Sequence, residues 1–121
     1  MATGAIKIIE QLSPIVTKTS GNAVVKKFLA FRSGHIVQIT FAFQNSGGKT
    51  TVGTNSFSGT VTGIPFPNNS VMGNAYYGSS ILIPRLTENG EFNIRVAGAD
   101  LAQQTGADSY GGSLIYLADQ Y

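Results

Sequence analysis

The sequence predicts an all-β protein, a single antiparallel β-sandwich or jelly roll, and three observations lead to this fold class. Apolar residues recur at every second position in several segments, which is the period of a half-buried strand. Fifteen glycines stand among the 121 residues, and turn clusters recur at a spacing of about 8–12 residues that is typical of sandwiches. Helical patterns are scarce, and the best of them covers one turn.

Two segments carry the clearest alternation. In the segment Glu91–Val96, the residues on one face are Phe92, Ile94 and Val96. In the segment His35–Phe43, they are Val37, Ile39, Phe41 and Phe43. We expect each segment to be a strand that turns these side chains into the core.

Other segments have strand length but a weaker pattern: Val24–Phe31, Gly59–Ile64 and Leu114–Leu117. The first bears apolar residues on both faces, as a strand at a subunit interface would. The run Ile81–Leu86 contains Pro84, which has no N–H to give to a neighbouring strand. This proline predicts an edge strand or a bulged strand.

Two dipeptides predict hairpins. Ser33-Gly34 separates two apolar runs by the short gap of a tight turn. Asn89-Gly90 is the strongest hairpin signal in the chain, so we expect Ile81–Thr87 to pair with Glu91–Val96. Asp100–Gln104 has the composition of a single helical turn with Asp100 as its N-cap.

The length of the chain predicts one domain. We assign residues 1–22 to an N-terminal segment that serves as an interface or an edge strand, and residues 23–121 to the sandwich. The chain has no cysteine, which excludes disulfides and thiolate metal sites within it and favours synthesis in a reducing cytoplasm.

Charged residues make up 12% of the chain, about half of the roughly 25% found in ordinary soluble domains. The net charge is +2, and Lys26-Lys27 is the only adjacent basic pair. Because no basic stripe is present, we expect no nucleic-acid partner. No apolar run reaches the length of about 18 residues that membrane insertion needs.

Motifs for catalysis are incomplete. Gly47-Gly48-Lys49-Thr50 ends like a phosphate-binding loop, but Phe43 stands where the first glycine belongs, so we expect an exposed loop. His35 is the only histidine, and we expect it to be structural or at the surface. Asp100 and Asp108 flank one Gly- and Gln-rich loop, and for this acidic pair capping or a turn is favoured over acid–base work. The sequence thus predicts no enzyme, no cofactor and no metal site.

Two stretches suit ligand binding better: a tyrosine pair beside a glycine, and a long polar loop over residues 99–112. Aromatic rings bind the C–H faces of sugars, while amide, carboxylate and guanidinium groups bond to their hydroxyls. The candidate ligand-binding residues are Tyr76, Tyr77, Arg85, Asp100, Gln103, Gln104, Asp108 and Tyr110. For the tyrosines the alternative is a place in the core or a subunit interface, with the hydroxyls hydrogen-bonded.

Five motifs follow one another between Val24 and Leu117. They are Ser33-Gly34-His35-Ile36-Val37-Gln38-Ile39, Gly63-Ile64-Pro65-Phe66-Pro67, Ile81-Leu82-Ile83-Pro84, Thr87-Glu88-Asn89-Gly90-Glu91-Phe92-Asn93-Ile94 and Gly112-Ser113-Leu114-Ile115-Tyr116-Leu117. In this order they resemble the C-terminal head domains of bacteriophage tail and baseplate proteins. The chain departs from that pattern in Ile64-Pro65-Phe66-Pro67, where leucine–proline is usual, and in a longer loop over residues 97–111.

The resemblance implies a viral receptor-binding head: a homotrimeric β-sandwich at the virion tail tip, synthesised in the cytoplasm of the host bacterium. It implies adhesion to host cell-wall saccharide and contact with other phage tail proteins. Sugar sites in such heads vary in place and often lie between subunits, so no ligand residue transfers by position. Two alternatives stay open: a purely structural tail assembly protein with the same fold, and a small polysaccharide hydrolase.

Overall fold

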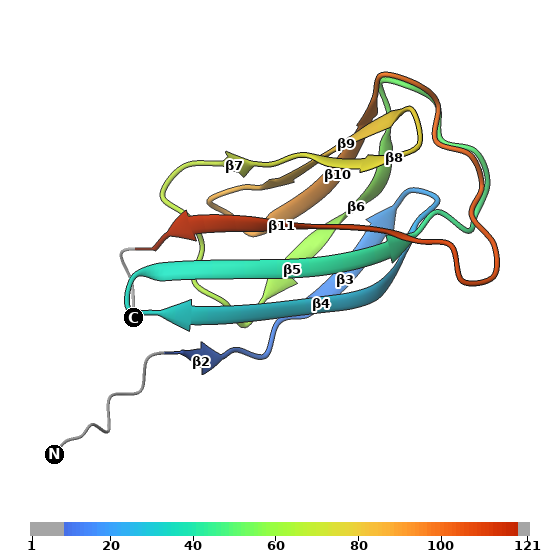
Figure 1. Cartoon of the computed structure of the whole chain (residues 1–121). Helices are drawn as coiled ribbons and strands as arrows, with labels where there is room; N and C mark the ends of the chain where they lie inside the picture. Colours follow the sequence, from blue (N-terminus) through green and yellow to red (C-terminus); the bar gives the residue numbers. More distant parts are fainter. Residues whose placement is uncertain (1–8, 119–121) are drawn as a thin grey trace, which may run out of the picture.

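The computed structural model describes residues 9–118, and this part of the chain is a β-sandwich of two antiparallel sheets that contains no helix. The predicted all-β fold class is therefore confirmed. Figure 1 shows the two sheets stacked, with β11, β5 and β4 in front. The strands are β2 (Glu10–Gln11), β3 (Ile15–Ser20), β4 (Val24–Ser33), β5 (Ile36–Gln44), β6 (Asn55–Thr62), β7 (Val71–Met72), β8 (Ala75–Tyr77), β9 (Ser80–Leu86), β10 (Glu91–Ala97) and β11 (Tyr110–Leu117).

The smaller sheet has the strand order β11-β5-β4-β2. Its strand β5 turns into the core the four side chains expected from the alternation: Val37, Ile39, Phe41 and Phe43, each at most 2% exposed. Strand β11 pairs with β5 over its whole length, from Tyr110 opposite Phe43 to Leu117 opposite Ile36. The period-two pattern of the sequence thus predicts correctly which face of β5 is buried.

The larger sheet has the order β3-β6-β10-β9, and β7 and β8 both pair with the outer side of β9. Strand β10 lies inside this sheet, between β6 and β9. As expected from the alternation, Phe92, Ile94 and Val96 are fully buried. The residues between them, Asn93 and Arg95, face away from the core.

Aromatic rings join the two sheets across the core. The Phe92 ring of the larger sheet meets the rings of Phe28 and Phe41 edge to face, at centroid distances of 5.3 and 5.6 Å. The Phe43 ring lies nearly parallel to those of Phe92 and Tyr110, at 5.9 and 6.0 Å. Such pairs contribute about 0.5–1.5 kcal/mol each beyond the burial of their area.

Both predicted hairpins are present. Gly34 and His35 form a two-residue turn between the paired residues Ser33 and Ile36, and Gly34 has φ of 60°. A glycine at the first central position is what a type II′ hairpin turn requires. The Asn89-Gly90 turn joins β9 to β10 in the expected pairing, which includes Leu86 opposite Phe92.

Pro84 lies in neither an edge strand nor a bulge, so that expectation is wrong. Strand β9 is covered on both sides, and its register with β10 is unbroken. The carbonyl oxygen of Pro84 accepts a hydrogen bond from Gly73 N, between β7 and β8. Because the N–H and C=O of a strand residue point to the same side, the missing donor faces the stretch between β7 and β8, and the ladder with β10 loses no hydrogen bond.

Two long connections cross between the sheets: residues 45–54 after β5 and residues 98–109 after β10. They run side by side, at the right of Figure 1. Thr50 N donates to Leu101 O at 2.8 Å, and Leu101 N donates to Thr50 O at 2.9 Å. The expected helical turn at Asp100–Gln104 is therefore wrong, because these backbone groups bond sideways to the neighbouring loop.

Part of the N-terminal segment 1–22 lies at the edges of both sheets. Strand β2 pairs with β4 in the smaller sheet, and β3 pairs with β6 in the larger one. Residues 1–8, and residues 119–121 at the other end, lie outside the described residues. Among residues 9–118, no helix has the length and apolar character needed to cross a membrane.

Candidate functional site

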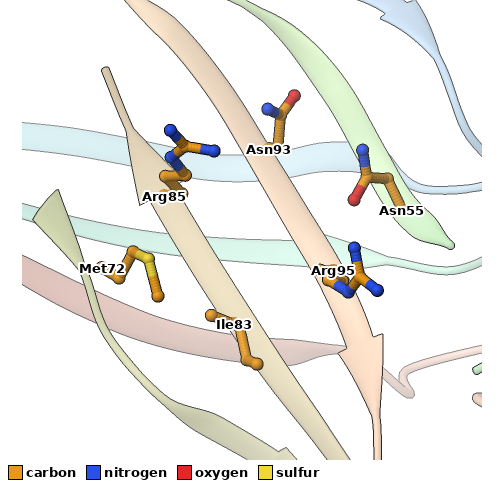
Figure 2. A pocket seen from close by; sticks show the side chains of 6 residues that line it. All are labelled: Asn55, Met72, Ile83, Arg85, Asn93 and Arg95. Atoms are coloured by element: carbon orange, nitrogen blue, oxygen red, sulfur yellow. The ribbon is translucent and has the colours of Figure 1, made fainter. Parts of the chain in front are cut away.

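The outward face of the larger sheet carries a groove of about 240 Å³. Figure 2 shows the side chains that line it, which come from four strands: Asn55, Met72, Ile83, Arg85, Asn93 and Arg95. Because all of them stand on strands, sheet hydrogen bonding fixes their backbone positions. A site built on strands is held more rigidly than one built on loops.

The strand registers arrange these side chains in two rows of three. Arg85 of β9 lies between Met72 of β7 and Asn93 of β10. Arg95 of β10 lies between Ile83 of β9 and Asn55 of β6. Directly opposite residues in antiparallel strands have Cβ atoms about 4.5–5.5 Å apart. Each arginine therefore has one amide and one apolar side chain as its cross-strand neighbours.

The groove is electrostatically positive, since two guanidinium groups and no carboxylate line it. Within residues 9–118, the one ion pair closer than 4 Å joins Lys49 to Asp100. Glu91 follows the same alternation as Asn93 on β10, yet it is not within that distance of either arginine. The one side-chain hydrogen bond of Arg85, to Ser70 Oγ, is long at 3.5 Å. Both guanidinium groups therefore keep donors for a ligand.

Of the eight predicted ligand-binding residues, Arg85 lies in this groove. Tyr76 and Tyr77 stand on β8, which pairs with the beginning of β9, and neither lines the groove. Tyr76 is 67% exposed, whereas Tyr77 is half-buried and packs against the core. The two tyrosines thus point to opposite sides, as alternation in a strand requires.

Four of the predicted residues belong to the loop over residues 98–109: Asp100, Gln103, Gln104 and Asp108. The exposed side chains of Asp100 and Gln103 brace the neighbouring loop. Asp100 Oδ1 accepts a hydrogen bond from Val52 N at 2.9 Å, and Oδ2 lies 3.6 Å from Lys49 Nζ. Gln103 Nε2 donates to the backbone oxygen of Ser46 at 2.9 Å. The side chain of Asp108 is exposed on a turn, away from the lining of the groove.

Gln104 and Tyr110 are buried, so they are unavailable to a ligand. Gln104 Oε1 accepts a hydrogen bond from Asn45 N at 2.8 Å. The Tyr110 hydroxyl donates to Ser56 Oγ at 2.9 Å, and Ser56 Oγ in turn donates to Asn45 Oδ1 at 2.9 Å. Both residues therefore satisfy buried polar groups around Asn45.

Asn45 is fully buried and joins the two long loops. Its Oδ1 also accepts a hydrogen bond from Thr50 Oγ1 at 2.9 Å. Its Nδ2 faces three backbone oxygens at 2.9–3.3 Å, those of Gly48, Leu101 and Ala102. A buried amide with this many partners acts as a structural hub, since its side chain hydrogen-bonds to groups of both loops in the interior.

Burial also changes the acidity of two tyrosines. Desolvation raises the pKa of the Tyr110 hydroxyl far above its ordinary value, and the hydrogen bond with Ser56 lowers it by a smaller amount. Desolvation likewise raises the pKa of Tyr116, against the opposing charge of Arg32. The Tyr116 hydroxyl donates to the backbone oxygen of Pro65. Both phenols stay protonated and serve packing.

The remaining motif residues have structural places. Lys49 of the Gly47–Thr50 loop is exposed, as expected for a surface loop, while Thr50 is buried. His35 is exposed, and its Nδ1 lies 2.8 Å from the backbone oxygen of Ala118. Among residues 9–118, no group of three or more His, Cys, Asp or Glu side chains is placed to hold a metal ion.

Five of the six groove residues are not among the candidates predicted from the sequence, although the sequence carries a signal for some of them. The alternation that buries Phe92 also turns Asn93 and Arg95 outward, and the Asn89-Gly90 hairpin sets them beside Ile83 and Arg85. Asn55 reaches the groove through β6, whose pairing with β10 is not set by a short turn. Met72 reaches it through β7, which pairs with β9 in the register set by the tight turn between Tyr77 and Ser80. No protein-family model and no curated protein matches the sequence of this chain.

Proposed function

We propose that this chain is a receptor-binding head of a bacteriophage tail or baseplate, and that it attaches the virion to a saccharide on the host surface without catalysis. The groove on the larger sheet is the observation that carries the proposal. A sugar ring offers an apolar C–H face and a rim of hydroxyls. Ile83 and Met72 suit the first, and the amides of Asn55 and Asn93 suit the second. The order of sequence motifs supports the phage assignment.

The proposal includes a homotrimer at the tail tip, which is supported by the outward face of the smaller sheet. Ile36, Ile115 and Leu117 on this face are 49%, 63% and 66% exposed. Ile115 lies opposite Gln38, which lies opposite Phe31, so an uncharged row crosses three strands. Along this row, identical copies can meet without repulsion between like charges. A trimer would present three weak sites together, which raises avidity by about 10²–10⁴.

The same apolar face also favours a second candidate function, a structural tail assembly protein that binds no saccharide. In that case another tail protein covers the face, and the groove has no glycan ligand. Saccharide binding by the purified protein therefore separates the two candidates.

The test titrates the purified protein with a panel of bacterial cell-wall polysaccharides in a calorimeter. We expect binding at millimolar or lower sugar. We expect Asn93→Ala to weaken it about tenfold, since one lost hydrogen bond in the groove costs about 1 kcal/mol or somewhat more. Tyr76→Ala, which removes an exposed side chain outside the groove, should leave binding unchanged. Absence of binding across the panel would count against the receptor-binding head.

A further inference from the structure

The groove carries a charge that neutral sugar recognition does not need. We infer that its ligand is an acidic saccharide, whose sugar units bear carboxylate or phosphate groups; this inference rests on the proposed function. Arg85 and Arg95 are both exposed and both line the groove. A neutral glycan would need only the amides and the apolar side chains beside them.

The placement of the two arginines is specific. They stand on neighbouring strands at diagonal positions, because Arg85 pairs with Asn93 while Arg95 pairs with Ile83. Diagonal neighbours in an antiparallel pair are about 7–8 Å apart. At that spacing the two flexible arginine side chains can bind one acid group from two sides, or they can bind two successive acid groups of a glycan. The planar guanidinium fork binds carboxylate or phosphate oxygens through two parallel hydrogen bonds.

The other lining side chains favour an acid group that is part of a sugar over a free anion. Each arginine is flanked by an amide that can bond to hydroxyls and by an apolar side chain that can contact C–H groups. The volume of about 240 Å³ lies just below the range of roughly 300–1,000 Å³ that encloses drug-sized ligands. Such a groove suits a short stretch of a glycan chain lying along the sheet.

The test sorts bacterial polysaccharides by whether they carry carboxylate, phosphate or no charge, and measures the affinity of each for the full chain. We expect the acidic ones to bind at least tenfold more tightly. Reduction of the uronic acid carboxylates to alcohols should remove this preference. The affinity for acidic polysaccharides should fall as salt rises from 50 to 500 mM, since salt screens exposed charges.

The variant Arg85→Gln/Arg95→Gln should lose the preference for acidic polysaccharides and keep its melting temperature. The matched control, Lys26→Gln/Lys27→Gln, removes two positive charges from the smaller sheet and should keep the preference. Inorganic phosphate is tested as a competitor, and we expect it to displace the glycan only at far higher concentration.

Three outcomes would overturn the inference. Equal binding of neutral and acidic polysaccharides, with no effect of the double arginine variant, would refute the acidic ligand and leave saccharide binding standing. Displacement by phosphate at the same concentration as the acidic glycan would reduce the groove to a general anion site. Binding of no polysaccharide would refute the proposed function itself.

Discussion

At the scale of single residues, the polar side chains in and beside the two long loops show that the same donor and acceptor groups can stabilise the fold or bind a ligand. Asn45, Gln104 and Tyr110 carry the donors and acceptors that recognise sugars, but they are buried and hydrogen-bonded within the fold, Gln104 to Asn45 and Tyr110 to Ser56. The exposed residues Arg85 and Arg95 carry similar donors, and apart from the long bond of Arg85 to Ser70 no side-chain hydrogen bond within residues 9–118 occupies them. Exposure, and not residue type, separates the structural polar residues from the candidate ligand residues.

Tyr110 makes folding sensitive to alkaline pH. Its pKa is raised in the folded chain, so the folded state keeps a proton that the unfolded state loses above its own pKa of about 10. The stabilising contribution is therefore complete below pH 10 and is lost as the pH rises toward the folded pKa. Between pH 9 and pH 11, we expect the free energy of unfolding to fall by about 1.4 kcal/mol more in the wild type than in Tyr110→Phe.

Urea denaturation of both proteins at the two pH values measures this difference. The phenylalanine variant keeps the aromatic ring that packs on Phe43 and lacks the titrating hydroxyl. The comparison therefore cancels the titration of lysines and of the other tyrosines. A parallel loss of stability in the two proteins would contradict a raised pKa for Tyr110.

At the scale of elements, the β9–β10 hairpin positions four of the six groove residues, and Gly90 closes its turn. Gly90 has φ of 86°, and a Cβ built there would lie 2.6 Å from Phe66 Cζ and 2.8 Å from the backbone oxygen of Val61. We expect Gly90→Ala to lower the free energy of unfolding by more than the roughly 1–2 kcal/mol that a left-handed alanine costs by itself. Chemical denaturation gives the value.

The matched control is Gly78→Ala. Gly78 also has positive φ, 58°, but a Cβ there has no neighbour within 4 Å. In this variant the backbone conformation alone should lower the free energy of unfolding. If the two substitutions cost the same, the contacts with Phe66 and Val61 do not constrain the turn.

Elements with local signals could be predicted from the sequence, while their neighbours in the sheets could not. The alternation in β5 and β10 and the turns at Gly34 and Gly90 predict two hairpins and most of the buried face. The placement of β6 beside β10 depends on pairs of residues more than 30 positions apart in sequence, such as Glu91 opposite Thr60. For this reason the sequence indicated Arg85 but not the groove around it.

At the scale of the whole molecule, the two outward faces of the sandwich differ in character. The larger sheet presents a positive groove, and the smaller sheet presents exposed apolar side chains. If the apolar face joins copies of the chain, as proposed, the grooves of the assembly stay accessible on the opposite sheets.

We expect the wild type to have three times the 12.7 kDa mass of one chain in analytical ultracentrifugation. Ile115→Lys should reduce the assembly to monomers, because burying a charge in an apolar interface is costly. Ile15→Lys is the matched control, since Ile15 is similarly exposed, at 65% against 63%, but lies on β3 of the other sheet. A monomeric wild type would exclude the trimer.

The pairing of the two long loops around Asn45 has a dynamic consequence. Neither loop can move away without breaking the hydrogen bonds of the other, so both must open in one cooperative event. In hydrogen–deuterium exchange, the amides of Thr50, Leu101 and Gln104 should then share one protection factor, although they come from connections about 50 residues apart. The two long connections at this end of the sandwich would then behave as a single rigid unit.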